Sequence, residues 1–201
     1  MTEKAVRTGK SGNSYESDAF DGYKFRIVLL GEASVGKTSL IRRYTENAFD
    51  DEYKQTIGTT FATKDLKLTD KAGTVRAVRL VVWDMGGQST YRELRRQFMK
   101  GASGAVIVYD VTRPETFMAM NTWFESFHEV CPSAPVVICA NKVDLESKRM
   151  VPHEPGLMLK NWFRADYFET SAKAGVAVSD VFIRMAQIVL DTALSERSPK
   201  V

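Results

Sequence analysis

The sequence predicts an α/β fold in which helices cover a mainly parallel sheet. From Tyr23 onward, short apolar segments alternate with segments of helical periodicity, a pattern typical of strand–helix–strand units. The first apolar segment runs directly into a glycine-rich loop and then a helix. With 201 residues, of which 44% are hydrophobic, the chain is long enough for one domain with a sizeable core.

Six strands are expected from the apolar segments. They are Phe25–Leu30, Thr60–Leu68, Val75–Trp83, Ala105–Tyr109, Val136–Ala140 and Tyr167–Glu169. The turn-forming cluster Thr69–Gly73 joins the second and third strands, so these two should pair as an antiparallel hairpin. The remaining strands are separated by helical segments and should run parallel.

Helical periodicity predicts about five helices. One follows the glycine-rich loop, and the others occupy Thr90–Met99, Glu115–Val130, Glu154–Ala165 and Val178–Leu194. Polar composition predicts a flexible leader at residues 1–22 and a short disordered tail at 196–201, on either side of a domain at 23–195.

The segment Gly31–Thr38 matches the pattern G-x-x-x-x-G-K-[ST] and follows a strand, as this phosphate-binding motif requires. Its glycines let successive backbone N–H groups face an anion, and the next helix adds the positive end of its dipole. Lys37 is placed to reach the outer phosphates, and the Thr38 hydroxyl to bind Mg²⁺. The candidate phosphate-binding residues of this segment are Gly31, Ala33, Ser34, Val35, Gly36, Lys37, Thr38 and Ser39.

Further candidates for metal binding and hydrolysis lie near the second and third strands. Asp84 can hold Mg²⁺ through a water, because Mg²⁺ keeps part of its hydration shell. Thr56, in the loop before the second strand, can add a second hydroxyl. Gly87 can offer a backbone N–H to the terminal phosphate. Gln88 can orient an attacking water and is therefore the catalytic candidate.

Two later strand ends carry residues suited to recognising guanine. Asp144 can accept N–H bonds from guanine N1 and its 2-amino group, which adenine lacks, so a carboxylate there discriminates between the two bases. The candidate guanine-binding residues in these two segments are Asn141, Lys142, Asp144, Ser171, Ala172 and Lys173. Each motif falls at the carboxyl end of an expected strand, where open α/β sheets bind ligands. The residues therefore predict Mg²⁺-dependent binding of GTP and GDP, and a P-loop kinase or ATPase is the alternative against which Asp144 argues.

Composition excludes several other classes of function. The formal net charge of +3 gives no electrostatic case for a nucleic-acid partner. Cys131 and Cys139 lie in or near apolar segments, so they are expected to be core residues in a reducing compartment rather than a disulfide. No apolar stretch reaches the roughly 18 residues that a transmembrane helix needs.

Taken together, the motifs over Tyr23–Leu194 resemble a small GTPase of the Ras superfamily, and most closely its Rab branch. Phe61, Trp83 and Phe98 match the aromatic trio that Rab proteins present to effectors, and Phe49 matches the aromatic that stacks on guanine. The resemblance implies a P-loop NTPase (Ras-like) three-layer fold, with a six-stranded, mostly parallel sheet and one antiparallel hairpin.

The resemblance also implies a molecular switch that hydrolyses GTP slowly, acting in intracellular or vesicle trafficking. The loops around Thr56 and Gln88 would be the two switches, which the γ-phosphate holds in order. Effector, exchange-factor and activating proteins would bind these switches and the aromatic trio. The resemblance further implies a cytoplasmic monomer, held peripherally on endomembranes through partners, because no C-terminal prenylation cysteine is seen.

Some positions depart from the Rab pattern. Gly86-Gly87-Gln88 is similar to the Arf branch, which makes an Arf-like GTPase an alternative. Ala33 replaces a glycine that some relatives need for fast hydrolysis, and Ser89 replaces an acid. These departures motivate a second alternative, a GTP-binding scaffold with little intrinsic hydrolysis.

One group of basic residues is left over on the predicted helix Thr90–Met99 and just after it. Arg92, Arg95, Arg96 and Lys100 lie about one face. A solvated helix face is the favoured interpretation, and docking to an acidic effector is the alternative.

Overall fold

The computed structural model describes residues 20–50, 59–85 and 92–197. Its strands are β1 (Tyr23–Leu30), β2 (Thr59–Thr69), β3 (Val75–Met85), β4 (Gly104–Asp110), β5 (Val136–Asn141) and β6 (Asp166–Thr170). Its helices are α1 (Lys37–Glu46), α2 (Arg92–Met99), α3 (Pro114–Met118), α4 (Met120–His128), α5 (His153–Phe163) and α6 (Val178–Arg197), with a 3₁₀ segment η2 (Val143–Lys148).

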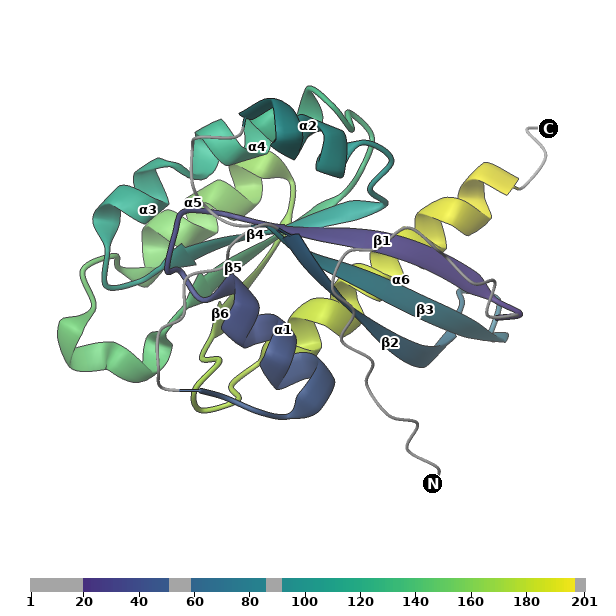
Figure 1. Ribbon diagram of the computed structural model, residues 1–201, viewed down its shortest axis with the longest axis horizontal. Coiled ribbons are helices and arrows are strands. Elements are labelled where there is room, and N and C mark those ends of the chain that lie inside the picture. The colour runs from purple at the N-terminus through teal and green to yellow at the C-terminus, as the bar shows by residue number, and fades with distance from the viewer. Residues whose placement is uncertain (1–19, 51–58, 86–91, 198–201) are drawn as a thin grey trace.

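The strands form a six-stranded sheet in the order β2-β3-β1-β4-β5-β6. Only β2 and β3 pair antiparallel, and every other neighbouring pair is parallel. This arrangement confirms the predicted α/β fold with its single hairpin. It also brings the carboxyl ends of β1, β3, β4, β5 and β6 to one end of the sheet (Figure 1). The motif residues that the structure describes lie at or just beyond these strand ends.

The hairpin turn is built by Asp70, within the predicted cluster. Its Oδ1 accepts the backbone N–H groups of Ala72 and Thr74 at 2.9 and 2.8 Å. Its Oδ2 accepts Arg76 Nε at 2.8 Å. These bonds, that from Arg76 above all, hold the pKa of Asp70 below its ordinary value. The next glycine, Gly73, has φ 81°, a conformation that strains residues with a side chain.

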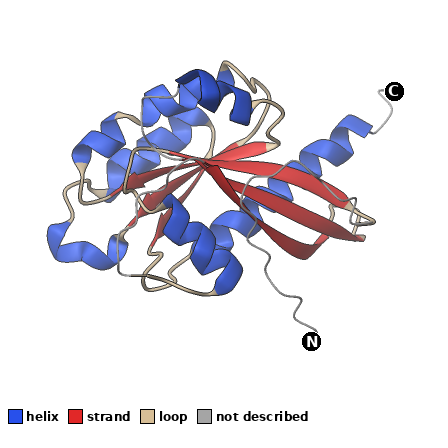
Figure 2. Cartoon of the chain, viewed as in Figure 1, coloured by secondary structure: helices blue, strands red, loops and turns tan. Residues whose placement is uncertain are grey.

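Helices cover both faces of the sheet (Figure 2). The apolar side chains of α1 and α6 pack on one face, while those of α2, α4 and α5 pack on the other. Successive β1 residues alternate between the two cores, with Ile27 in the first and Val28 in the second. Cys139 and Cys131 are free and buried, one in each core, as predicted.

The expected helices differ from the structure most in two places. The prediction of one helix over Glu115–Val130 is wrong, because the chain forms α3 and α4 instead. Ala119 between them has ψ −9°, far from the roughly −42° of an α-helix, so the helix breaks there. Helix α6 reaches Arg197, beyond its expected end at Leu194. Thr90 and residues 1–19 lie outside the described residues.

Within the described part of the chain, no helix is long and apolar enough to cross a membrane.

Replacing Phe182 by alanine should lower the free energy of unfolding by about 3–5 kcal/mol. Its ring is 1% exposed and stacks on Tyr44 with centroids 4.3 Å apart, so its removal leaves a cavity between α1 and α6. The neighbouring Ile183 is 43% exposed, and Ile183→Ala should cost about 1 kcal/mol or less. Urea denaturation in a fixed excess of Mg²⁺ and GDP measures both, and equal losses would contradict the packing described here.

Candidate functional site

The predicted phosphate loop lies at the carboxyl end of β1 and leads into α1 (Figure 1). Gly31, Ser34 and Gly36 all have positive φ, at 133°, 65° and 99°. A Cβ on Gly31 would lie 2.2 Å from the Val108 carbonyl oxygen, and one on Gly36 would lie 2.3 Å from Asn141 Nδ2. The glycines are therefore required both for the turn and for close approach of neighbouring strands.

Lys37, the first residue of α1, is buried with its amine against the loop. Its Nζ donates to the carbonyl oxygens of Gly31 and Glu32, both at 2.8 Å. Burial lowers the pKa of Lys37 to about 8, although the negative charges of Asp84 and Glu32 oppose the shift. A polyphosphate bound in the loop would favour the charged amine further.

Thr38 of α1 and Asp84 of β3 bring two oxygen ligands together. The Thr38 hydroxyl donates to Oδ2 of Asp84, whose side chain is 1% exposed. A hydroxyl and a carboxylate are hard oxygen ligands of the type that Mg²⁺ prefers, and two such groups leave positions for water and phosphate oxygens. The donor set therefore fits the expected ion. Among the described residues, no group of at least three His, Cys, Asp or Glu side chains is arranged to hold a metal.

Asn141, at the end of β5, contacts two other loops of the site. Its Nδ2 donates to the carbonyl of Val35 at 2.8 Å. Its Oδ1 accepts the Thr170 hydroxyl at 3.1 Å and the Ala172 backbone N–H at 3.3 Å. One buried amide thus joins the phosphate loop to both segments that carry the candidate guanine-binding residues.

Asp144 lies beside the loop that follows β6. The Ser171 hydroxyl donates to Asp144 Oδ1 at 2.6 Å and accepts the Ala174 backbone N–H at 2.9 Å, so Ser171 orients the carboxylate. Lys173 Nζ lies over the Phe49 ring, 6.0 Å from its centroid. The structure therefore brings Asp144, Ser171, Lys173 and Phe49 to the same end of the sheet as the phosphate loop.

Three predicted site residues cannot be placed. Thr56, Gly87 and Gln88 lie outside the residues that the structure describes.

Arg43 is a site residue that the sequence analysis missed. It lies on α1, and its Nε and Nη2 donate to the carbonyls of Ala172 and Lys173, each at 2.8 Å. It thereby supports the loop that is predicted to meet the guanine carbonyl. Its partners lie 129 and 130 residues away, so no local pattern announces the contact.

Trp123 was also missed, although it contacts the phosphate loop from α4. Its Nε1 donates to Glu32 Oε1 at 3.1 Å. On its ring lies the Arg95 guanidinium of α2, 4.7 Å from the ring centroid. Arg96 pairs with Glu129 at 2.9 Å. Arg95 and Arg96 therefore both have partners within the chain. These contacts favour the interpretation that the basic residues form a solvated helix face and not a docking site for an acidic effector. The Arg92 side chain lies outside the part of the chain that the structure describes.

The aromatic trio forms a continuous cluster across β2, β3 and α2. Phe61 stacks on Trp83 with centroids 5.8 Å apart, and Trp83 meets Phe98 at 5.8 Å. All three residues are partly exposed.

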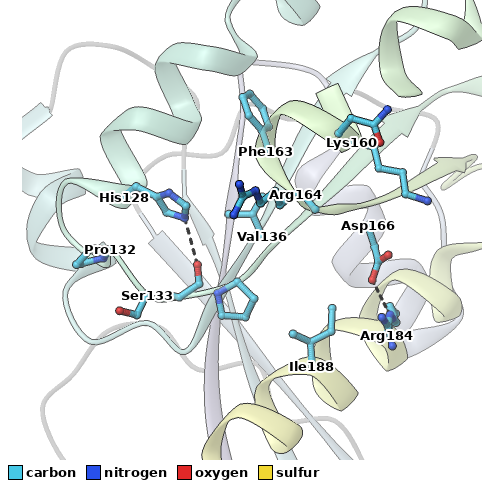
Figure 3. A pocket seen from close by; sticks show the side chains of 14 residues that line it. His128, Pro132, Ser133, Val136, Lys160, Phe163, Arg164, Asp166, Arg184 and Ile188 are labelled. Atoms are coloured by element: carbon cyan, nitrogen blue, oxygen red, sulfur yellow. Dashed lines mark hydrogen bonds and ion pairs between the residues drawn. The ribbon is translucent and has the colours of Figure 1, made fainter. Parts of the chain in front are cut away.

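A cavity of about 640 Å³ lies at the opposite end of the sheet (Figure 3). Its lining includes Val136 and Asp166, the first residues of β5 and β6, so it is distinct from the carboxyl ends where the motifs lie. Asp166 is paired with Arg184 at 2.6 Å on its wall. None of the predicted nucleotide-binding residues lines it.

Comparison with known proteins shows the family of the chain. The Ras family profile matches residues 26–191. The chain is similar to the Ras-related protein Rab-3B of Homo sapiens, at 34% identity over 188 residues, which cover 93% of this chain and 84% of the relative. It is also similar to Rab-3C of Mus musculus (31%, covering 95% and 82%) and Rab-3D of Mus musculus (35%, covering 84% and 75%).

The fold and the matched region define a Ras-like GTP-binding domain. The chain belongs to the Ras family and stands near its Rab branch, so it is a small GTPase that hydrolyses GTP. The resemblance predicted from the motifs is therefore confirmed.

Glu169→Gln should weaken the folded protein in a pH-dependent way. Burial opposes ionisation of Glu169, but hydrogen bonds from His153 and Arg149 outweigh it and hold its pKa below the ordinary value. The stabilisation is therefore present above the unfolded pKa of about 4.3 and is lost as the pH falls through the lower folded value.

At pH 7 the variant should be about 1 kcal/mol less stable than the parent, and the difference should vanish toward pH 3. Urea denaturation across that range measures the difference. A gap that stays constant down to pH 3 would show that the ionised form of Glu169 is not what stabilises the β6 end.

Proposed function

We propose that this chain is a Rab-like molecular switch whose nucleotide spans Asp144 and Lys37. The supporting observation is the position of Asn141, whose hydrogen bond to Val35 joins the base-recognition segment to the phosphate loop. A single ligand can then contact both ends of the site. Comparison with the Rab-3 proteins favours this function over an Arf-like GTPase or a scaffold with little hydrolysis.

Guanine would be selected by the Asp144 carboxylate. Ser171 holds its Oδ1 at 2.6 Å, so the second oxygen, Oδ2, has a defined direction toward a base. Adenine would leave this acceptor without the N1 and 2-amino donors of guanine, which is a costly loss. Phe49 and the Lys142 stem would cover the faces of the ring, and the N–H groups of Ala172 and Lys173 would face its carbonyl.

The phosphates would be held by the N–H groups of the loop Gly31–Thr38 and by Lys37. Mg²⁺ would be held by Thr38 and Thr56 and, through water, by Asp84; when bound, it neutralises phosphate charge during hydrolysis. Gln88 would orient the attacking water, with the Gly87 N–H on the terminal phosphate. None of the motifs assigns an arginine to the γ-phosphate, so acceleration would come from an activating partner.

We also propose a role in vesicle trafficking, in the cytoplasm and peripherally on endomembranes. Effector, exchange-factor and activating proteins would bind the segments around Thr56 and Gln88 together with Phe61, Trp83 and Phe98. The partly exposed aromatic cluster, which includes Phe98 of α2, supports this surface, because aromatic side chains are frequent anchors of protein interfaces. The chain would act as a monomer.

Asp144→Ala should lower the preference for GDP over ADP by at least about a hundredfold. The variant loses the acceptor that distinguishes the two bases but keeps the phosphate loop. Glu146→Ala is the matched control, because this acid is two residues away, 74% exposed and paired with Arg149 instead. Competition of GDP and ADP against a fluorescent guanine nucleotide measures the preference. An Asp144→Ala protein as selective as the control would remove Asp144 from base recognition.

Gln88→Leu should slow intrinsic GTP hydrolysis by at least about tenfold while leaving GTP affinity nearly unchanged, because the lost amide orients water only. Gln187→Leu is a suitable control, since Gln187 lies on α6 and donates to Thr69 and Asp191. Single-turnover hydrolysis of bound GTP provides the measurement. Equal rates for the two variants would mean that Gln88 does not act in the chemical step.

A further inference from the structure

A buried carboxylate at the end of β4 touches both halves of the nucleotide site. The Asp110 side chain is 1% exposed and lies 2.7 Å from Lys142 Nζ and 3.2 Å from Arg113 Nε. It also accepts the Thr112 hydroxyl at 2.7 Å and the Thr112 N–H at 2.9 Å. Burial opposes ionisation, but the bonds from Lys142 and Thr112 outweigh it, so the pKa of Asp110 is lower than usual. Asp110 is therefore a buried anion that orients two cations.

One of these cations, Arg113, contacts the phosphate loop. Its Nη2 donates to the carbonyl oxygen of Ala33 at 2.7 Å, across 80 residues of sequence. When the backbone N–H groups of a loop face a bound anion, its carbonyl groups point away from the anion. These carbonyl oxygens then need hydrogen-bond donors from other parts of the chain. Arg113 is such a donor, and its charged guanidinium makes the bond stronger than a neutral one.

We propose that Arg113, oriented by Asp110, is a positioning residue that holds the phosphate loop at a fixed distance from the guanine motif. By restraining the loop, Arg113 lowers the rate at which the nucleotide dissociates. The inference rests on the proposed function, because it concerns the same nucleotide site. Arg113 acts through the Ala33 carbonyl and not by touching the nucleotide.

Two anchors restrain the loop where one would leave it free to pivot. Asn141 holds the Val35 carbonyl, and Arg113 holds the Ala33 carbonyl two residues earlier. Both anchors lead back to the guanine motif, one directly and one through Asp110 to Lys142. A shift of the motif would thus be transmitted to the loop at two points.

A purely local role for Arg113 does not account for these contacts. Arg113 precedes α3, but its side chain makes no capping hydrogen bond to that helix. Its acidic neighbour in the helix, Glu115, is 3.9 Å away, farther than Asp110. The shortest contact of the guanidinium is the one to Ala33.

The test compares dissociation of fluorescent GDP from Arg113→Ala, Arg113→Lys and Arg184→Ala in the presence of Mg²⁺. Arg113→Ala should release GDP at least about tenfold faster, as expected for loss of a charge-assisted hydrogen bond. Arg113→Lys should recover part of the loss, since its amine can still donate to Ala33. Arg184→Ala removes an arginine–aspartate pair at the far end of the sheet and should stay within about twofold of the parent.

A second measurement separates positioning from general loosening of the site. Inosine diphosphate lacks the 2-amino group that Asp144 is proposed to read. In Arg113→Ala the affinity ratio of GDP to inosine diphosphate should equal that of the parent, because base recognition is intact. The inference would be overturned if Arg113→Ala released GDP at the same rate as Arg184→Ala. It would also be overturned if the affinity ratio of GDP to inosine diphosphate fell well below that of the parent.

The same measurements distinguish this inference from the proposed function. A parent protein with no preference for GDP over ADP would overturn both. If the parent prefers GDP over ADP and the Arg113→Ala variant releases GDP as slowly as Arg184→Ala does, only the role of Arg113 is overturned.

Discussion

The hydrogen bond from Asn141 to the Val35 carbonyl is the contact on which the site depends. It joins residues 106 positions apart and fixes the end of β5 against the phosphate loop. Gly36 makes the contact possible, because a Cβ there would lie 2.3 Å from Asn141 Nδ2. Gly36 therefore both shapes the loop and leaves room for the Asn141 amide, so a side chain at position 36 would displace Asn141.

Around this contact the domain keeps several charges out of water. Lys37, Asp84 and Asp110 are each nearly inaccessible, and burial of a charge is costly unless it has partners. Each has partners here: the loop carbonyls for Lys37, the Thr38 hydroxyl for Asp84, and two cations for Asp110. Such pairs are weak sources of stability, so the stability of the fold must come from the two apolar cores on either side of the sheet.

Most of the fold was predictable because its signals are local. β1, β4 and β5 are apolar segments bounded by polar or turn-forming residues. The cluster around Asp70 makes its turn through hydrogen bonds within six residues. The break at Ala119 was not predictable, because apolar residues continue at helical spacing on both sides of it. The supports of the site were not predictable either: Arg43, Arg113 and Trp123 contact partners 80 to 130 residues away.

The sequence by itself determined the class of this protein. A phosphate loop after a strand and a carboxylate motif after another strand define the chemistry from short, ordered patterns, and the Ras family match agrees with them. Only the tertiary structure decided how these pieces are held: which carbonyls Arg113 and Asn141 support, and that Ser171 orients Asp144. The physical reason is that a motif is local in sequence and contains the residues that contact the ligand. The hydrogen-bond donors that support those residues lie at or just after the ends of other strands, which come together only when the sheet forms.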